Sequence, residues 1–213
     1  MRNACLALIF VLVSAASAVE VRVATFNTGA HFGTTYFDYS LGDPGTPDYE
    51  SVKAVLARIN ADVVALQEIH AADLQGSPND LQSLAAALGY PHVHVAPVSG
   101  AFDTVFQVAI LSKFPFISES DVVSPPGAKE LSRLHPLVKV DVPGTPNDLV
   151  MAAVHLKSET SLADRFRRAV EVKRLVAQLT ASGAGNDDNF IVLGDFNPSS
   201  INATFSALPT GLP

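Results

Sequence analysis

Short apolar segments of strand length recur along most of the sequence, and Pro or Gly separates the majority of them. They span residues 19–26, 62–66, 92–97, 106–111, 116–123, 136–142, 149–156 and 190–193. Helical periodicity marks a helix capped by Asp48, a second helix over 79–88 and the longest over 161–179. Several neighbouring strands have hairpin-length links, which favour antiparallel pairs within a chain that also carries helices in both halves. The pattern predicts mixed sheets flanked by helices, a layered α/β fold rather than a doubly wound one.

Composition places the chain among globular proteins with one core. Hydrophobic residues make up 48% of its 213 residues, so intrinsic disorder is excluded and a single domain is the natural interpretation. Cys5 is the sole cysteine. Disulfide scaffolds, zinc-cysteine clusters and thiol catalysis are therefore excluded, and any metal must be held by oxygen or imidazole.

The N-terminus has the three parts of a secretory signal peptide. Arg2 supplies a positive charge, an unbroken apolar stretch covers 4–13, and A-S-A at 16–18 matches a cleavage signal. A buried N-terminal strand or helix is the alternative. We expect residues 1–18 to be removed, which leaves 19–213 as one secreted or periplasmic domain. Beyond the leader, no apolar run approaches the roughly 18 residues that span a bilayer.

The longest predicted helix carries apolar and basic residues in a helical repeat. We expect its apolar stripe to pack on a sheet, and the stripe comprises Leu162, Phe166, Ala169, Val172, Leu175, Val176 and Leu179. The basic residues from Arg165 to Arg174 are expected to form a solvated face, with a positive patch for a polyanion as the alternative. A binding role is favoured for Arg133 and Lys157, which lie outside the helix.

Polar residues follow the apolar strands at the points where these strands stop. Asn27 follows the first strand, Glu68 the second, and His155 lies near the end of the seventh. Asp195 and Asn197 follow the last strand. Strand ends that share one rim of a sheet can bring such residues together, however far apart they are in sequence.

The final segment, L-G-D-F-N-P, predicts local geometry as well. Asp195 and Asn197 are two residues apart, so both are expected to point to one side of an extended chain. Gly194 is expected to let the backbone approach a ligand closely, and Pro198 to stop the strand.

These strand-end residues offer the amide of Asn27, the carboxylates of Glu68 and Asp195 and the imidazole of His155, without any thiol. Such a set indicates a metal site with mainly oxygen ligands, which suits Mg²⁺ or Mn²⁺. Glu68, oriented by Asn27, could supply the protein side of such a site. Each residue also has an ordinary structural explanation, since a carboxylate after a strand is often a helix cap and a strand histidine is often a core residue. The set of four segments favours the metal site.

The same segments contain four short motifs in a fixed order: T-F-N at 25–27, L-Q-E at 66–68, V-H-L-K-S at 154–158 and L-G-D-F-N-P at 193–198. Two further features are V-A-I-L-S-K at 108–113 and Arg133 before an apolar strand. Together they resemble a known family, the endonuclease/exonuclease/phosphatase superfamily with its DNase-I-like fold. The resemblance runs from Val19 to about residue 200, and it implies two facing mixed β-sheets with helices on the outer sides.

Site roles follow from the resemblance residue by residue. It implies that Asn27, Glu68 and Asp195 hold a divalent ion, Mg²⁺ or Mn²⁺, and that Asp195 orients the ion or the nucleophilic water. His155 would bind a phosphate oxygen and stabilise charge in the transition state. Arg133 and Asn197 would bind the same phosphate, a task for which a planar guanidinium is well suited.

The sequence departs from the family pattern at its C-terminal end. The resemblance implies a closing Asp-His pair whose His acts as general base, yet no Asp or His follows Asn197. We expect the domain to be truncated there; a protein without the usual base is the alternative. Losing a general base typically costs about 10²- to 10⁴-fold in rate.

Three functions are consistent with these observations. The first is a secreted Mg²⁺-dependent phosphodiesterase, most simply an endonuclease acting on extracellular nucleic acid. The second is a phosphoesterase of the same fold that acts on a phospholipid, sphingolipid or phosphosugar, since fold does not determine substrate. The third is a non-catalytic protein that binds metal or phosphate. Removal of Arg2 leaves 13 basic against 21 acidic residues, which does not favour tight non-specific DNA binding.

Overall fold

The computed structural model describes residues 19–29, 41–98, 105–145, 148–183 and 189–198. The predicted signal peptide and the residues to which the expected truncation refers lie outside this part of the chain. Within the described ranges, no helix combines the length and the apolar character needed to cross a membrane.

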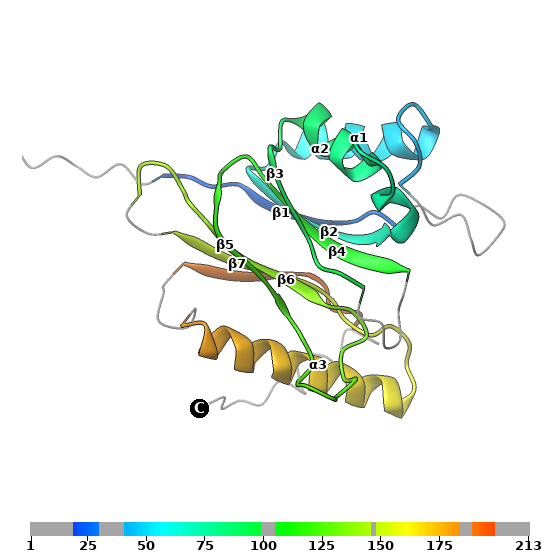
Figure 1. Cartoon of the computed structure of the whole chain (residues 1–213), viewed down its shortest axis with the longest axis vertical. Helices are drawn as coiled ribbons and strands as arrows, with labels where there is room; N and C mark the ends of the chain where they lie inside the picture. Colours follow the sequence, from blue (N-terminus) through cyan, green and yellow to red (C-terminus); the bar gives the residue numbers. More distant parts are fainter. Residues whose placement is uncertain (1–18, 30–40, 99–104, 146–147, 184–188, 199–213) are drawn as a thin grey trace, which may run out of the picture.

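The described strands form two four-stranded sheets that face each other (Figure 1). The first sheet has the order β1-β2-β4-β3, in which β1 and β2 are parallel and the other pairs are antiparallel. Its strands are β1 (Val23–Asn27), β2 (Val63–His70), β3 (His92–Val95) and β4 (Phe106–Ser112). The sheet is therefore mixed, as predicted.

The second sheet repeats this plan with the order β5-β6-β7-β8. Here β7 and β8 are parallel, and the remaining pairs are antiparallel. Its strands are β5 (Phe116–Val122), β6 (His135–Val140), β7 (Leu149–His155) and β8 (Phe190–Asp195). Each sheet thus contains one pair of parallel strands, and these two pairs carry Asn27, Glu68, His155 and Asp195.

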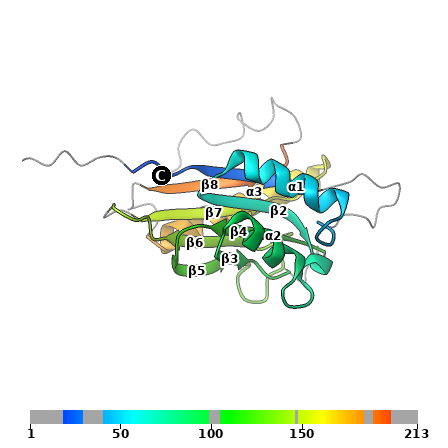
Figure 2. The ribbon, with the colours of Figure 1, turned by 90° about the horizontal axis from the view of Figure 1, so that it is seen from above.

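Helices cover the outer face of each sheet (Figures 1 and 2). Those over the first sheet are α1 (Pro47–Ile59), the 3₁₀ helix η1 (Ala71–Leu74) and α2 (Asp80–Leu88), and α3 (Leu162–Ala181) lies over the second. The predicted arrangement of two facing mixed sheets with helices outside is confirmed. It is the layering expected when each sheet has two apolar faces to bury.

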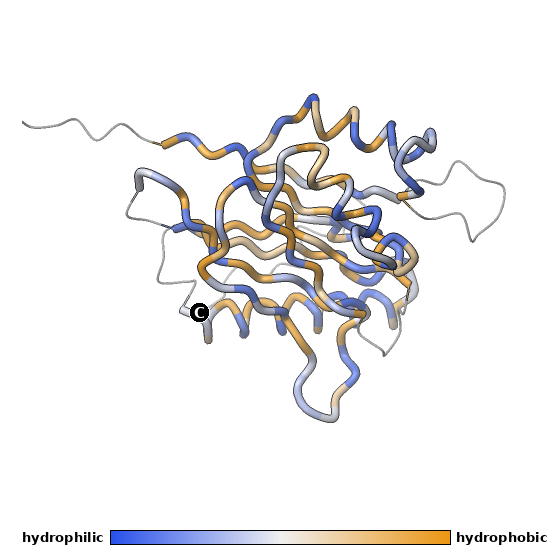
Figure 3. Tube along the Cα trace, turned by 45° about the horizontal axis from the view of Figure 1, so that its top comes forward, coloured by the Kyte–Doolittle hydropathy of each residue, from blue (hydrophilic) through white to orange (hydrophobic). Residues whose placement is uncertain are grey.

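Three apolar clusters correspond to the three interfaces between these layers. One lies between the first sheet and its helices and includes Leu56 and Leu66. A second lies between the sheets and includes Val63 and Met151, and a third joins the second sheet to α3 through residues such as Leu175. Figure 3 shows hydrophobic residues concentrated along the central strands, whereas α3 alternates between hydrophobic and hydrophilic. Strands that are apolar on both faces therefore occupy the middle of the molecule.

The start of α1 differs from the prediction. The helix begins at Pro47, with Thr46 as its N-cap residue and no side-chain cap hydrogen bond, so Asp48 is not the cap. Proline is favoured at the first helical position because that position needs no amide donor. Asp48 lies instead in the first turn, where its charge complements the positive end of the helix dipole.

The buried face of α3 also differs from the predicted apolar stripe. Leu175 and Leu179 are buried as predicted, but Leu162 is 83% exposed and Phe166 is 71% exposed. The positions that face the protein in the first half of the helix are charged, and they include Glu171. The prediction of a fully apolar inner stripe was therefore wrong for the N-terminal half of α3.

An imidazole links the edges of the two sheets. His94 on β3 has its Nδ1 2.9 Å from Glu119 Oε2 and its Nε2 3.1 Å from Asp121 Oδ1, and both carboxylates belong to β5. The hydrogen bond to Asp121 raises the pKa of His94 above its ordinary value of 6.5, although burial opposes this effect. Protonation lets both ring nitrogens donate, so the charged imidazole holds the two sheet edges together.

We expect the stability contributed by His94 to be lost as the pH rises. The pKa of His94 is raised in the folded state, so the contribution is complete below the unfolded-state pKa and disappears as the pH passes through the folded-state value. The free energy of unfolding of the wild type should exceed that of His94→Gln by up to about 1 kcal/mol near pH 6, and by less near pH 9. Urea denaturation at a series of pH values measures this difference.

The difference between the two proteins is the informative quantity, because His135 acts in the opposite direction. Burial lowers the pKa of His135 to about 3, so both proteins lose stability as the pH falls below the ordinary histidine value. A difference between the wild type and His94→Gln that stays constant with pH would contradict the assignment.

Candidate metal and phosphate site

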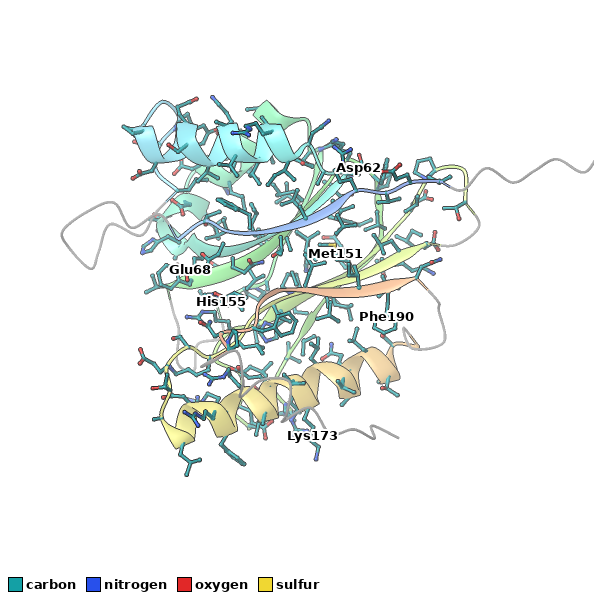
Figure 4. The ribbon with its side chains drawn as sticks, turned by 180° about the vertical axis from the view of Figure 1, so that it is seen from behind. Asp62, Glu68, Met151, His155, Lys173 and Phe190 are labelled. Atoms are coloured by element: carbon teal, nitrogen blue, oxygen red, sulfur yellow. The ribbon has the colours of Figure 1, made fainter. Side chains whose placement is uncertain are left out.

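The parallel strands place the predicted site residues at one end of the sandwich. Asn27 ends β1, His155 ends β7 and Asp195 ends β8. Across the central layer, β1 lies against β8 and β2 lies against β7 (Figure 2). Figure 4 shows Glu68 and His155 close together at this end of the two sheets. The expected convergence of strand ends is therefore present.

Side-chain alternation directs these residues into the gap between the sheets. Met151 and Ala153 pack in the central cluster, so His155 faces the same gap two residues further on. Leu193 packs against this cluster in the same way and sets the direction of Asp195. The pleat of β7 and β8 thus brings an imidazole and a carboxylate to the inner rim.

Glu68 reaches the same gap through a β-bulge. Ala65 faces the central layer and Leu66 faces the helices, so regular alternation would put Glu68 on the helix side. The register between β2 and β4 shifts between Leu66 and Ile69, and Ile69 again packs on the helix side. Glu68 itself adopts a φ of 62°, a left-handed conformation that costs about 1–3 kcal/mol for a residue other than glycine. The bulge turns this carboxylate toward His155.

Short distances join the four side chains. Asn27 Nδ2 donates to Glu68 Oε1 over 2.9 Å and to Asp195 Oδ2 over 3.2 Å. His155 Nε2 lies 3.6 Å from Glu68 Oε1 and 3.9 Å from Asp195 Oδ2, and the imidazole is almost completely buried. Glu68, His155 and Asp195 each offer one ligand atom, and these three atoms lie within 4.8 Å of one another. The three side chains therefore form a possible metal site.

Arg133 and Asn197 meet at one backbone carbonyl beside this cluster. The carbonyl oxygen of Leu156 accepts hydrogen bonds from Arg133 Nη1 at 3.3 Å and from Asn197 Nδ2 at 2.9 Å. Leu156 directly follows His155, and its own amide donates to the carbonyl of Asp195 at 2.9 Å. All six predicted site residues are thus brought to one end of the molecule.

The local conformation after Asp195 differs from the prediction of an extended chain. Asn197 has a φ of 45°, and its amide donates to Asp195 Oδ1 over 2.8 Å. The backbone therefore turns after β8, and Asp195 and Asn197 do not alternate along one strand. The turn lets the Asn197 side chain reach Leu156 while Asp195 Oδ2 stays beside Asn27.

Gly194 allows β7 and β8 to approach each other closely. The predicted approach of its backbone to a ligand stays a prediction. A Cβ at this position would lie 2.0 Å from the carbonyl oxygen and 2.7 Å from the amide nitrogen of Val154. Val154 is the register partner of Gly194 in the β7–β8 pair. The close approach at Gly194 is therefore one between two strands of the protein.

Gly29 is a site residue that the sequence did not reveal. Its amide donates to Asn27 Oδ1 over 2.8 Å, and a Cβ at this position would lie 2.0 Å from Glu68 Oε2. Gly29 therefore leaves room for the Glu68 carboxylate to sit against Asn27. The only sequence signal is its place two residues after the T-F-N motif, at the start of a glycine-containing loop.

Gly29→Ala is expected to weaken the binding of a divalent cation to this candidate site, because the added methyl group displaces the Glu68 carboxylate. The affinity should fall by about 10-fold or more, the range typical when the support of a metal ligand is removed. Titration calorimetry with Mg²⁺ measures the change. Gly127→Ala is the control, because a Cβ there meets nothing within 4 Å. Equal affinities for the two variants would contradict the role given to Gly29.

Solved structures share this fold at low sequence identity. Sphingomyelinase C from Streptomyces griseocarneus superposes with a TM-score of 0.61 and 21% identity, over 89% of this chain and 68% of that one. A β-hairpin deletion mutant of beta toxin from Staphylococcus aureus gives a TM-score of 0.58 and 18% identity, over 88% and 70%. The human Nocturnin catalytic domain with bound sulfate gives 0.59 and 16%, over 84% and 65%. The chain thus spans about two thirds of the length of these structures.

At these identities the similarity establishes the fold, and no curated protein sequence matches the chain significantly. The family assignment comes from the sequence model of the Endonuclease/Exonuclease/phosphatase family, which matches residues 24–208. That range includes every residue of the cluster described above. The chain belongs to the Endonuclease/Exonuclease/phosphatase family.

Proposed function

We propose that the protein is a divalent-metal-dependent phosphoesterase that hydrolyses phosphodiester bonds, most simply those of extracellular nucleic acid. The observation that carries the proposal is the meeting of two carboxylates and an imidazole with an arginine and an asparagine at one rim. Anionic groups hold a cation, and the arginine beside them attracts a phosphate. A cation and an arginine side by side can both stabilise the negative charge of a phosphoryl group during its transfer.

The cluster fits a hard divalent cation. Asn27 Nδ2 donates to one oxygen of Glu68 and one of Asp195, so two anionic oxygens converge on a single point. Oxygen donors with this much negative charge favour Mg²⁺ or Mn²⁺ over softer metals. Glu68 and Asp195 would hold the ion, and Asn27 would join them through Oδ1 after its amide group rotates, because an amide N–H₂ donates and does not bind a cation. When bound, the ion would polarise a phosphoryl oxygen and stabilise charge on the leaving oxygen.

His155 and Asp195 have positions suited to the charged transition state. The buried imidazole directs Nε2 toward the carboxylates, where it would donate a hydrogen bond to a phosphate oxygen. Asp195 uses Oδ1 to accept from the amide of Asn197, which fixes the carboxylate plane. Its Oδ2 stays on the cluster side, where it would orient the attacking water or the ion.

Arg133 and Asn197 would bind the phosphate from the other side. Arg133 Nη1 and Asn197 Nδ2 both donate to the carbonyl oxygen of Leu156, so this backbone atom holds the two side chains next to each other. A guanidinium carries its N–H donors in a planar fork whose geometry matches the oxygens of a phosphate. The substrate phosphate would thus lie between the arginine and the cation site.

A turnover assay with metal control tests this function. Purified protein is incubated with supercoiled plasmid and, separately, with bis(4-nitrophenyl) phosphate, in the presence of Mg²⁺, Mn²⁺ or EDTA. The proposal expects plasmid nicking and nitrophenol release that EDTA abolishes. Thermal stabilisation by Mg²⁺ without turnover of any substrate would instead favour the non-catalytic alternative. If the protein shows neither turnover nor stabilisation by Mg²⁺, both hypotheses are refuted.

A lipid phosphodiester is the second candidate substrate. Leu162 and Phe166 lie one helical turn apart on α3 and are the two most exposed large apolar residues in the described part of the chain. Such a pair is suited to contact with a membrane surface. The fold is also shared with a sphingomyelinase C. Turnover of sphingomyelin or phosphatidylcholine vesicles with plasmid left intact would favour this candidate.

We also propose that the protein is exported, on the basis of the leader-like residues 1–18. Expression of the complete sequence in a secreting host tests this point. The N-terminal sequence of the exported protein should then begin at Val19.

A further inference from the structure

The backbone after β7 is held in one conformation by side chains of α3. Residues 157–159, called the 157–159 loop below, follow the Leu156 carbonyl to which Arg133 and Asn197 bind. Glu159 adopts a φ of 82°, a left-handed conformation that a glutamate rarely takes. Such a conformation persists only where several contacts with the surrounding structure hold it in place.

Glu171 is the first of the α3 residues that hold this region. Its side chain is completely buried, and each carboxylate oxygen accepts a backbone hydrogen bond of 2.8 Å. One donor is the amide of Ser132, which directly precedes Arg133. The other is the amide of Lys157, which directly follows Leu156. A buried carboxylate needs such donors to offset its loss of hydration, so the two segments are tied to one side chain.

Arg168 holds the same loop from the preceding turn of α3. Its side chain is buried, and Nη1 donates to the carbonyls of Lys157 at 2.7 Å and Glu159 at 2.8 Å. Arg168 and Glu171 therefore bond both the amide and the carbonyl of Lys157. This is why charged residues replace the predicted apolar stripe at this end of the helix.

We propose that Glu171 and Arg168 are positioning residues that fix the phosphate-binding half of the site, an inference that rests on the function proposed above. Through Ser132 and Lys157, Glu171 sets the separation between Arg133 and the Leu156 carbonyl. Neither α3 residue has a hydrogen bond in the described structure to Asn27, Glu68 or Asp195. The two halves of the site meet at Asp195, whose carboxylate is also held by Asn27 and by the amide of Asn197. We therefore expect loss of the α3 contacts to weaken phosphate binding more than cation binding.

Calorimetric titration of the full chain with Mg²⁺, and then with inorganic phosphate in the presence of Mg²⁺, tests the proposal. Glu171→Gln keeps the shape of the side chain but presents an amide N–H₂ to one of the two backbone donors. We expect its phosphate affinity to fall about 10-fold or more, and its Mg²⁺ affinity to stay within about twofold of the wild type. The KM for bis(4-nitrophenyl) phosphate should rise in parallel.

Leu175→Ala is the matched control, because Leu175 is buried on the same helix and belongs to the apolar cluster between α3 and the second sheet. It should lower the melting temperature without changing phosphate affinity. If Glu171→Gln does not fold, Arg168→Lys serves instead, since it keeps the charge and loses the reach to two carbonyls.

Three results would overturn the proposal. The first is an unchanged phosphate affinity in the Glu171 or Arg168 variant. The second is a loss of Mg²⁺ affinity in that variant as large as its loss of phosphate affinity. The third is a loss of phosphate affinity in Leu175→Ala as large as that in the Glu171 or Arg168 variant. A wild-type protein that binds neither Mg²⁺ nor phosphate would overturn the proposed function itself, and this inference with it.

Discussion

Gly194→Ala is expected to destabilise the protein by about 3 kcal/mol or more. The new methyl group would lie 2.0 Å from the carbonyl oxygen of Val154, an atom of the neighbouring strand that cannot rotate away. The φ of 139° at this position adds strain, because side chains of L-residues rarely allow it. Relief requires β8 to move away from β7, which breaks the ladder that carries Asp195. Urea denaturation measures the free energy of unfolding.

Gly89→Ala separates the collision from the backbone strain. Gly89 ends α2 with a φ of 76°, and a Cβ there would meet nothing within 4 Å. This variant should cost only the strain of a left-handed alanine, about 1–2 kcal/mol. A Gly194 variant that is no less stable than the Gly89 variant would show that the two strands can separate without penalty. Failure of Gly194→Ala to fold, with Gly89→Ala folded, agrees with the expectation.

The layered fold and the strand-end residues could be predicted because their signals are local. An apolar run of strand length that stops at a polar residue marks a strand end, as at Asn27, His155 and Asp195. Parallel neighbours then bring such ends together without any further information. Hairpin-length links in the middle of the chain indicated mixed sheets for the same reason.

The inner face of α3 could not be predicted, because hydropathy does not show which backbone groups a helix will meet. Phe166 fits an apolar stripe and Glu171 fits a solvated face, yet Phe166 is exposed and Glu171 is buried. What decides the outcome is the pair of loop amides that need acceptors beside α3. Those amides come from segments 39 and 14 residues away, so no window along the helix contains them.

The directions of Glu68 and Asn197 also depend on events that the sequence does not mark. Both adopt a positive φ without being glycine, one in a β-bulge and the other in the turn after β8. Alternation along a regular strand would have put Glu68 on the face of the sheet that the helices cover. For Asn197, the same rule wrongly predicted an extended chain in which its side chain and that of Asp195 point to one side. The identities of the site residues could thus be predicted, but the backbone that orients them could not.

Glu68→Gln is expected to lower kcat/KM for phosphodiester hydrolysis by about 10²- to 10³-fold, the loss typical when one group that supports transition-state charge is removed. The variant keeps an oxygen that can accept the 2.9 Å hydrogen bond from Asn27, so the bulge should persist. It removes one of the two negative charges that face His155 and Asn27. Without metal, the Glu68→Gln variant should therefore be at least as stable as the metal-free wild type, because the repulsion between Glu68 and Asp195 is relieved.

Opposite effects on stability and activity distinguish a functional carboxylate from a structural one. In EDTA, the melting temperature of Glu68→Gln should equal or exceed that of the wild type, whereas the stabilisation by Mg²⁺ should be lost. Glu130→Gln removes a carboxylate that pairs with Arg174 and, within the described residues, forms no hydrogen bond or ion pair with Asn27, His155 or Asp195, so it should keep both the activity and the response to Mg²⁺. A Glu68 variant that loses stability in EDTA along with activity would assign the residue to the fold. One that keeps its activity would place the metal elsewhere.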